Sequence, residues 1–294
     1  MPGQLARAGR LLLIAGLSAP FAAAQEPAPY DPVAGTAWTQ GERVRLEVSQ
    51  EERGRHAMGD AVREVQTVTA ATLHLSVSEV GEHGRLRAAE LRVERFTQRR
   101  GAGEEVGVEP VTVRLVCAAG PEGRLGVQPP AAGAPPLARP LALLLSEVAG
   151  WLDPALDGAL LQGQPMHAGT EWRPAPEALA RAFVPAGGDV EAGPAEESLT
   201  LRLTIEGDAV RVEGRGPLPL RTLPGARGAR VDGPLESTLE LRAEWPRARC
   251  PSRGGKLEAT YRFQGAALNR LPDGKEQRIT ASQVRGLKLA IAPE

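Results

Sequence analysis

The chain has 294 residues, 42% of them hydrophobic, and a formal net charge of −1 at pH 7. This near neutrality argues against a nucleic-acid-binding protein, which displays a concentrated basic surface. Aromatic residues make up only 3% of the chain, which leaves few stacking platforms for sugars or bases.

The first 24 residues, 1–24, have the order of a secretory signal peptide. Two arginines precede an apolar run, and three alanines precede Gln25. A serine and a proline interrupt the run, which is shorter than the roughly 20 apolar residues of a membrane span. We therefore expect cleavage before Gln25, no transmembrane segment in the mature chain, and a periplasmic or secreted location.

Apolar and polar residues alternate with a period of two along the rest of the chain. This period is typical of antiparallel strands with one buried face. Short connections that contain glycine, such as 81–84 and 207–208, indicate hairpin turns, and the Gly-rich stretch 214–216 is interpreted as a linker between strands. The strands are expected at 44–48, 73–77, 111–117, 199–206, 239–245, 257–263 and 287–291.

One segment, at about 140–152, follows the period of a helix instead, and prolines at 140 and 154 bound it. Its apolar stripe predicts packing on the sheet, since soluble monomers rarely leave such a patch in water. Any ligand site is expected beneath this helix, in an apolar cleft with Trp151 at its edge. The residues of this predicted cleft are Leu141, Leu144, Leu145, Val148, Trp151 and Leu152.

A four-residue motif occurs twice, after the signal peptide and after the predicted helix. Its repeated residues are Gly35, Thr36 and Trp38, and then Gly169, Thr170 and Trp172. The repeat suggests two related β halves, although coincidence in a Gly-rich chain is the alternative.

The expected fold is therefore mainly β, with an antiparallel curved sheet or open barrel and one packed helix. An N-terminal β half, 25–165, contains the central helix, and a C-terminal β half, 166–294, completes one continuous unit.

The chain resembles a group of poorly characterised bacterial exported proteins. The segment 165–172, which contains the second copy of this motif, carries the resemblance. These proteins are of about this size and carry a Gly-Thr/Asp-x-Trp motif after an apolar segment that contains proline. More distantly, the expected layout is similar to the lipoprotein-carrier class of open β-barrels, which shelter acyl chains. That second similarity concerns the fold alone and matches none of a carrier's functional residues.

Cys117 and Cys250 are the only cysteines. In an oxidising compartment such a pair predicts one disulfide, and two separate thiols are the alternative.

The sequence contains no pattern that indicates catalysis, a metal site or a cofactor. The four histidines lack the spacing of zinc ligands, and the nucleophile elbow Gly-x-Ser-x-Gly is absent. We expect a non-catalytic envelope protein that binds an apolar ligand or a protein partner. The alternatives are a structural or interaction module without a small ligand, and a hydrolase whose site the sequence does not reveal.

Overall fold

The chain is described by a computed structural model. It covers residues 28–32, 37–118, 124–128, 136–152, 157, 160–161, 163–184, 191–224, 229–271 and 274–294. The predicted signal peptide lies outside these described residues, as do Gly35 and Thr36 of the repeated motif.

Thirteen strands form one antiparallel sheet in the order β6-β5-β3-β2-β1-β13-β12-β11-β9-β8-β7, with β4 added to β3 and β10 added to β12. Since β6 and β7 stand at its two ends, the sheet is open and does not close into a barrel. The strands are β1 (Arg43–Met58), β2 (Ala61–Val80), β3 (Leu86–Arg100), β4 (Glu105–Val108), β5 (Val111–Cys117), β6 (Leu125–Val127), β7 (Glu171–Trp172), β8 (Leu201–Glu206), β9 (Ala209–Pro217), β10 (Arg230–Val231), β11 (Glu236–Pro246), β12 (Gly255–Arg270) and β13 (Glu276–Pro293).

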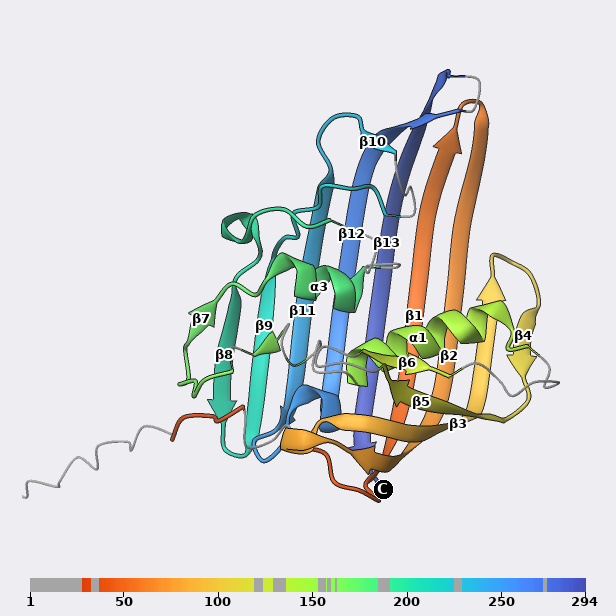
Figure 1. Cartoon of the computed structure of the whole chain (residues 1–294). Helices are drawn as coiled ribbons and strands as arrows, with labels where there is room; N and C mark the ends of the chain where they lie inside the picture. The colour runs from red at the N-terminus through yellow and green to blue at the C-terminus, as the bar shows by residue number, and fades with distance from the viewer. Residues whose placement is uncertain are drawn as a thin grey trace, which may run out of the picture.

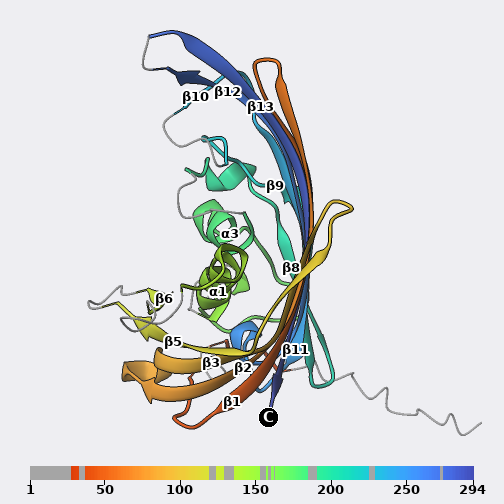
Figure 2. The ribbon, with the colours of Figure 1, turned by 90° about the vertical axis from the view of Figure 1, so that its right-hand side faces the viewer.

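Two α-helices of the described chain, α1 (Arg139–Leu152) and α3 (Pro176–Phe183), lie across the strands on one face of the sheet (Figure 1). Seen from the side, the sheet is curved and both helices lie within its concave face (Figure 2). Among the described residues there are also three short 3-10 helices: η1 (Glu82–Gly84), η3 (Ala195–Glu197) and η4 (Pro251–Arg253). The prediction of a mainly β protein with a curved antiparallel sheet and a packed helix near 140–152 is confirmed.

The ladder between β1 and β13 joins the two parts of the chain at the middle of the sheet. It pairs Val44 with Pro293 at one end and Met58 with Ile279 at the other. Strands β1 to β6 lie on one side of this ladder, and β7 to β12 lie on the other. The two predicted halves thus occupy the two sides of one sheet, and their relationship by duplication stays a prediction.

The core fills the concave face between the sheet and the helices. On β1, Val44, Leu46 and Val48 point inward and are at most 2% exposed. Leu46 pairs with Leu73 of β2 and Ile291 of β13, so aliphatic side chains form continuous rows across the sheet. Because such rows remove a large apolar area from water, they stabilise the sheet against the helices that cover it.

Several predicted boundaries were wrong. The central strands are 15 to 20 residues long, well beyond the runs of clean alternation in the sequence. The stretch 214–216, interpreted as a linker, lies inside β9, where Gly214 and Gly216 pass close to the backbone of Thr200 and Leu199. A side chain at either glycine would collide with that neighbouring segment, so glycine here serves close approach within a strand.

The predicted disulfide between Cys117 and Cys250 is not formed, and each cysteine keeps its thiol. Cys117 ends β5 and pairs with Leu125 of β6, near one end of the sheet. Cys250 is buried immediately before η4, at the connection from β11 to β12. In the strand order β3, β2, β1 and β13 separate β5 from β12, so the sequence pair does not become a spatial pair.

A candidate binding cavity between helix α1 and the sheet

The concave face changes from apolar to polar partway along β1. Side chains alternate between the faces of a strand, so Gln50 and Glu52 follow Val48 on the concave face. Both are half-buried, whereas Val48 is fully buried. The concave face is therefore apolar as far as Val48 and polar from Gln50 onward, and this second part is called the polar zone.

One row of paired residues crosses this polar zone. Arg100 of β3 is paired with Thr67 of β2, Thr67 with Glu52 of β1, and Glu52 with Arg285 of β13. Directly paired side chains of an antiparallel sheet have Cβ atoms about 4.5 to 5.5 Å apart. The row thus places the Glu52 carboxylate beside Arg285 and, beyond Thr67, a second guanidinium, that of Arg100, on the face that the helices cover.

Glu147 of α1 fixes the helix over the start of the polar zone. Its Oε2 accepts a hydrogen bond from Gln50 Nε2 at 2.7 Å and one from Arg285 Nη2 at 2.5 Å. The Arg285 side chain is 6% exposed and also donates to the backbone oxygen of Phe183 in α3 at 3.5 Å. Because a buried guanidinium needs a counter-charge and hydrogen-bond acceptors, these contacts satisfy Arg285.

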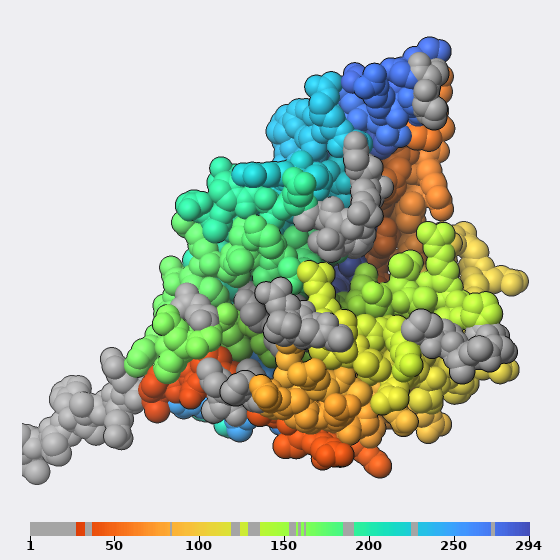
Figure 3. All heavy atoms as spheres, viewed as in Figure 1, coloured from red at the N-terminus to blue at the C-terminus, as the bar shows by residue number. Residues whose placement is uncertain are grey.

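A cavity of about 1000 Å³ opens beside this ion pair, between the first turns of α1 and the upper parts of β1 and β2. Figure 3 shows the surface hollowed at this place, with α1 on one side and β1 and β2 on the other. The helix side is mainly apolar and includes Pro140, Leu143 and Leu144. The sheet side is mainly polar and includes Gln50, Glu52, Thr67, Thr69, Gln98 and Arg285.

The charges around the cavity are unequal. Six arginines and three glutamates line it. Arg285 is neutralised by Glu147, and Arg53 pairs with Glu51 at 2.5 Å. By the alternation of side chains along the strands, Arg55 and its pair Glu64 point to the opposite face of the sheet. The remaining lining groups on the concave face, which form no ion pair with a described residue, are the cations Arg63, Arg100 and Arg139 and the anion Glu52.

The six residues predicted to form an apolar cleft are all buried, each at most 3% exposed. Of these, Leu144 lines the cavity, and the others pack into the core among the sheet and α3. Trp151 is 1% exposed, and its Nε1 donates to the backbone oxygen of Ala182 at 3.0 Å. This indole joins α1 to α3.

The second copy of the motif leads into the edge strand β7. Gly169 adopts a φ of 84°, a conformation that favours glycine, and its N–H donates to the Leu203 oxygen. Trp172 is buried, with an indole N–H that has no partner among the described residues. In the first copy the ring of Trp38 is buried under the guanidinium of Arg253, 5.6 Å from its centre. In the described residues, the motif therefore makes packing and turn contacts.

A second polar cluster is buried where η4 meets the segment after α1. Ser252 Oγ donates to Asp157 Oδ2 and lies 3.2 Å from Cys250 Sγ. Burial raises the pKa of Asp157, and burial together with the Asp157 charge raises the pKa of Cys250 to about 12. A thiol with so high a pKa is a poor nucleophile at neutral pH, and no histidine takes part in these hydrogen bonds. These hydrogen bonds hold the segment after α1 against η4.

No group of three or more histidine, cysteine, aspartate or glutamate side chains within the described ranges could hold a metal ion. Neither α1 nor α3 has the length and hydrophobicity that a membrane-spanning helix requires.

The polar residues of the cavity were missed by the sequence analysis. Arg285 and Gln283 continue the inward positions of Leu287, Leu289 and Ile291 back along β13. The inward positions of β13 continue without interruption, but they change from aliphatic to polar residues. From one strand alone, this change cannot be distinguished from a face that becomes exposed to solvent.

No protein-family model matches the sequence, and no curated protein does either. The group suggested by the Gly-Thr/Asp-x-Trp motif is thus not supported by any family model. Among the solved structures with partial similarity to this chain are lipovitellin and OpdQ.

The first is lipovitellin, in a study of its lipid–protein interactions, with a TM-score of 0.38 and 10% identity over 87% of this chain and 26% of that one. The second is OpdQ of Pseudomonas aeruginosa, with a TM-score of 0.19 and 8% identity over 85% of this chain and 57% of that one. The chain thus spans about a quarter of lipovitellin and little over half of OpdQ. At TM-scores this low, neither similarity bears on function.

Proposed function

We propose that the protein is a non-catalytic exported envelope protein that binds an amphipathic ligand in the cavity beside α1. The observation that carries this proposal is the two-sided lining, with Pro140, Leu143 and Leu144 on the helix side and polar groups on the sheet side. Binding pockets for small molecules have volumes of about 300 to 1000 Å³ and combine apolar walls with a few polar groups. An amphiphile would place its apolar part on the helix and its polar part on the sheet.

Leu143 supports this assignment because it is 58% exposed, although it lies in α1, which is more apolar than α3. Its neighbours Leu141, Leu144 and Leu145 are buried in the core. An apolar ligand part that covered Leu143 would remove this side chain from water, which is favourable by about 25 cal/mol per Å² of buried area.

The test is calorimetric titration of the mature protein with dodecyl maltoside, an uncharged amphiphile, below its critical micelle concentration. We expect binding, and we expect Leu143→Gln to weaken it while the melting temperature stays unchanged, since glutamine also favours helix. Val106→Thr is the matched control, because Val106 is 59% exposed on β4 and does not line the cavity. Unchanged affinity of Leu143→Gln, or no binding at all, would contradict the proposal.

The export part of the proposal rests on the sequence of residues 1–24. Sequencing the N-terminus of protein recovered from the periplasm tests it, with Gln25 as the expected first residue. Recovery of the chain in the cytoplasm with its leader intact would overturn it. Mass spectrometry of material that co-purifies with this protein is the most direct route to the natural ligand.

A further inference from the structure

We propose that the cavity selects amphiphiles with an anionic head group, such as a phosphate or carboxylate, an inference that rests on the proposed function. Three cations on the concave face, Arg63, Arg100 and Arg139, form no ion pair with a described residue, and they outnumber the one such anion, Glu52. Arginine binds phosphate and carboxylate oxygens through its planar fork of N–H donors.

Arg100 of β3 lies on the sheet side of the cavity, where the anionic head group would bind. Its Nε donates to Gln98 Oε1 at 3.1 Å, which orients the guanidinium and leaves its terminal N–H groups available for a ligand. In the row across the sheet, Thr67 separates Arg100 from Glu52. A hydroxyl beside the guanidinium supplies a further donor for an oxyanion.

Arg139 stands on the opposite wall, as the first residue of α1. No acidic residue occupies the first turn of this helix, so no carboxylate within that turn competes for the Arg139 guanidinium. An anion between the walls would thus meet Arg139 from the helix and Arg100 from the sheet, while its apolar chain extends toward Leu143 and Leu144.

The carboxylate of Glu52 would repel a bound anion, so a variant without this charge tests the inference. It lies in the same row as Arg100 and Arg285, and it forms no ion pair with a described residue. Arg285 turns instead to Glu147 of α1. Removing the Glu52 charge should therefore strengthen anion binding, whereas removing the charge of Arg100 or Arg139 should weaken it.

The experiment compares three probes by calorimetric titration: dodecyl phosphate, dodecyl maltoside and inorganic phosphate. We expect dodecyl phosphate to bind most tightly and to lose affinity as the salt concentration rises. Arg100→Gln and Arg139→Gln should each weaken dodecyl phosphate by about fivefold, as expected for one exposed charge pair. Glu52→Gln should strengthen it, and each of the three variants should change the affinity for dodecyl maltoside less than that for dodecyl phosphate.

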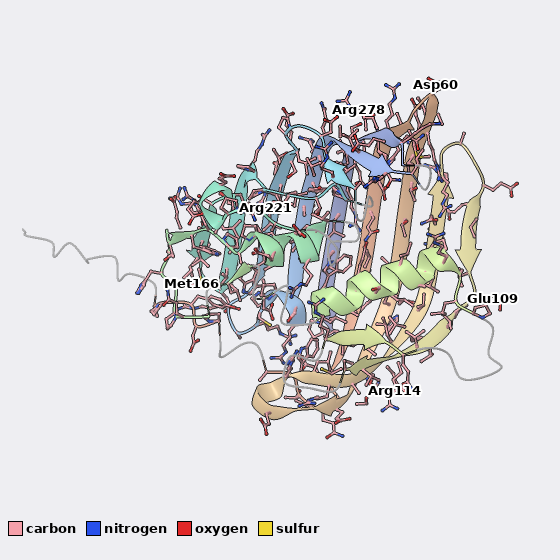
Figure 4. All side chains as sticks on the ribbon, turned by 45° about the horizontal axis from the view of Figure 1, so that its top comes forward. Asp60, Glu109, Arg114, Met166, Arg221 and Arg278 are labelled. Carbon is pink, nitrogen blue, oxygen red and sulfur yellow. The ribbon has the colours of Figure 1, made fainter. Side chains whose placement is uncertain are left out.

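Arg114→Gln is the matched control, since Arg114 is an exposed arginine on β5 that does not line the cavity. Figure 4 shows its position below α1, on the opposite side of the helix from the hairpin tip at Asp60. Melting temperatures of all variants establish that they fold.

Each of the other possible results would contradict either this inference alone or the proposed function as well. Equal affinities for the two dodecyl amphiphiles, unaffected by the charge variants, would overturn the anion inference and leave the proposed function standing. Binding of inorganic phosphate as tight as that of dodecyl phosphate would show a site for free anions and overturn the inference. Failure of both amphiphiles to bind would overturn the proposed function and this inference with it.

Discussion

The buried carboxylate of Asp157 accepts two hydrogen bonds from Ser252, from its hydroxyl at 2.7 Å and from its backbone N–H at 3.1 Å. The residues are 95 positions apart, so this contact fastens the segment after α1 to the connection between β11 and β12.

Asp157→Ala should lower the free energy of unfolding by about 1 to 3 kcal/mol, because the buried N–H of Ser252 loses its acceptor. Asp157→Asn should retain the native fold, since an amide oxygen accepts the same N–H bond. Urea unfolding of both variants measures the difference. Equal loss in the two variants would show that packing at this position matters more than the hydrogen bonds.

The pH dependence of the same site has a definite sign. Burial raises the pKa of Asp157 above its ordinary value of 3.8, so this carboxyl binds a proton more strongly in the folded than in the unfolded protein. The stability this group contributes is full below pH 3.8 and is lost as the pH rises through the folded pKa. Compared with Asp157→Asn, which cannot ionise, the unmodified protein should therefore lose stability as the pH increases from 3.8 toward neutrality. A difference that is constant with pH would contradict the raised pKa.

Removing Glu147 should be costly because Arg285 would stay buried without its counter-charge. We expect Glu147→Ala to destabilise the protein by about 3 kcal/mol, at the lower end for a buried pair because Glu147 is 29% exposed. The double variant Glu147→Leu with Arg285→Met should recover most of this loss, since it removes both charges. Thermal unfolding measures both, and a double variant no more stable than Glu147→Ala would show that the pair itself stabilises the fold.

Two neighbouring leucines of α1 should respond very differently to truncation. Leu145 is fully buried, so Leu145→Ala should cost about 2 to 5 kcal/mol of unfolding free energy. Leu143→Ala, at a position 58% exposed, should change it by less than about 0.5 kcal/mol. Similar losses in the two variants, measured by urea unfolding, would mean that the helix is docked with another face toward the sheet.

His74 should titrate above its ordinary pKa of 6.5. A hydrogen bond from its Nε2 to Glu94 Oε2 at 2.8 Å raises the pKa most, and the contact of Nδ1 with the carboxylate of Glu294 adds to it. The stability from this cluster is complete below pH 6.5 and is lost as the pH rises through the folded pKa of His74. Proton NMR of the ring should show the raised pKa, and Glu94→Gln should lower it. A pKa that Glu94→Gln leaves unchanged would mean that the pair is broken in solution.

Much of the architecture could be predicted because inward-facing aliphatic residues alternate along most strands and recur with the helical period in α1. Strand β3 was not predicted because three register irregularities in its pairing with β2 break that period. Its Ala88 and Ala89 are adjacent and both buried, which a regular strand does not allow. The alternation that identifies a strand is lost where a bulge turns one residue to the other face.

The cavity could not be predicted for a different reason. Glu52, Arg100 and Arg285 lie on three strands far apart in the sequence, and they share a row only through the registers of β1 with β2 and β13 and of β2 with β3. On each strand separately a charged residue is typical of a face exposed to solvent. Register depends on the pairing of the whole sheet, so the row becomes visible only in the folded structure.

The ladder between β1 and β13 has a consequence for how the chain folds. It pairs residues about 220 to 250 positions apart and lies in the middle of the sheet, so its hydrogen bonds form only after nearly the whole chain has emerged. Contacts of such sequence separation carry a large loop-closure entropy, and proteins dominated by them fold in milliseconds to seconds, slowly for single domains. Until β13 arrives, β1 and β12 each present an unpaired edge to other chains, and a partly synthesised chain is therefore most prone to aggregate at what becomes the best-protected part of the finished sheet.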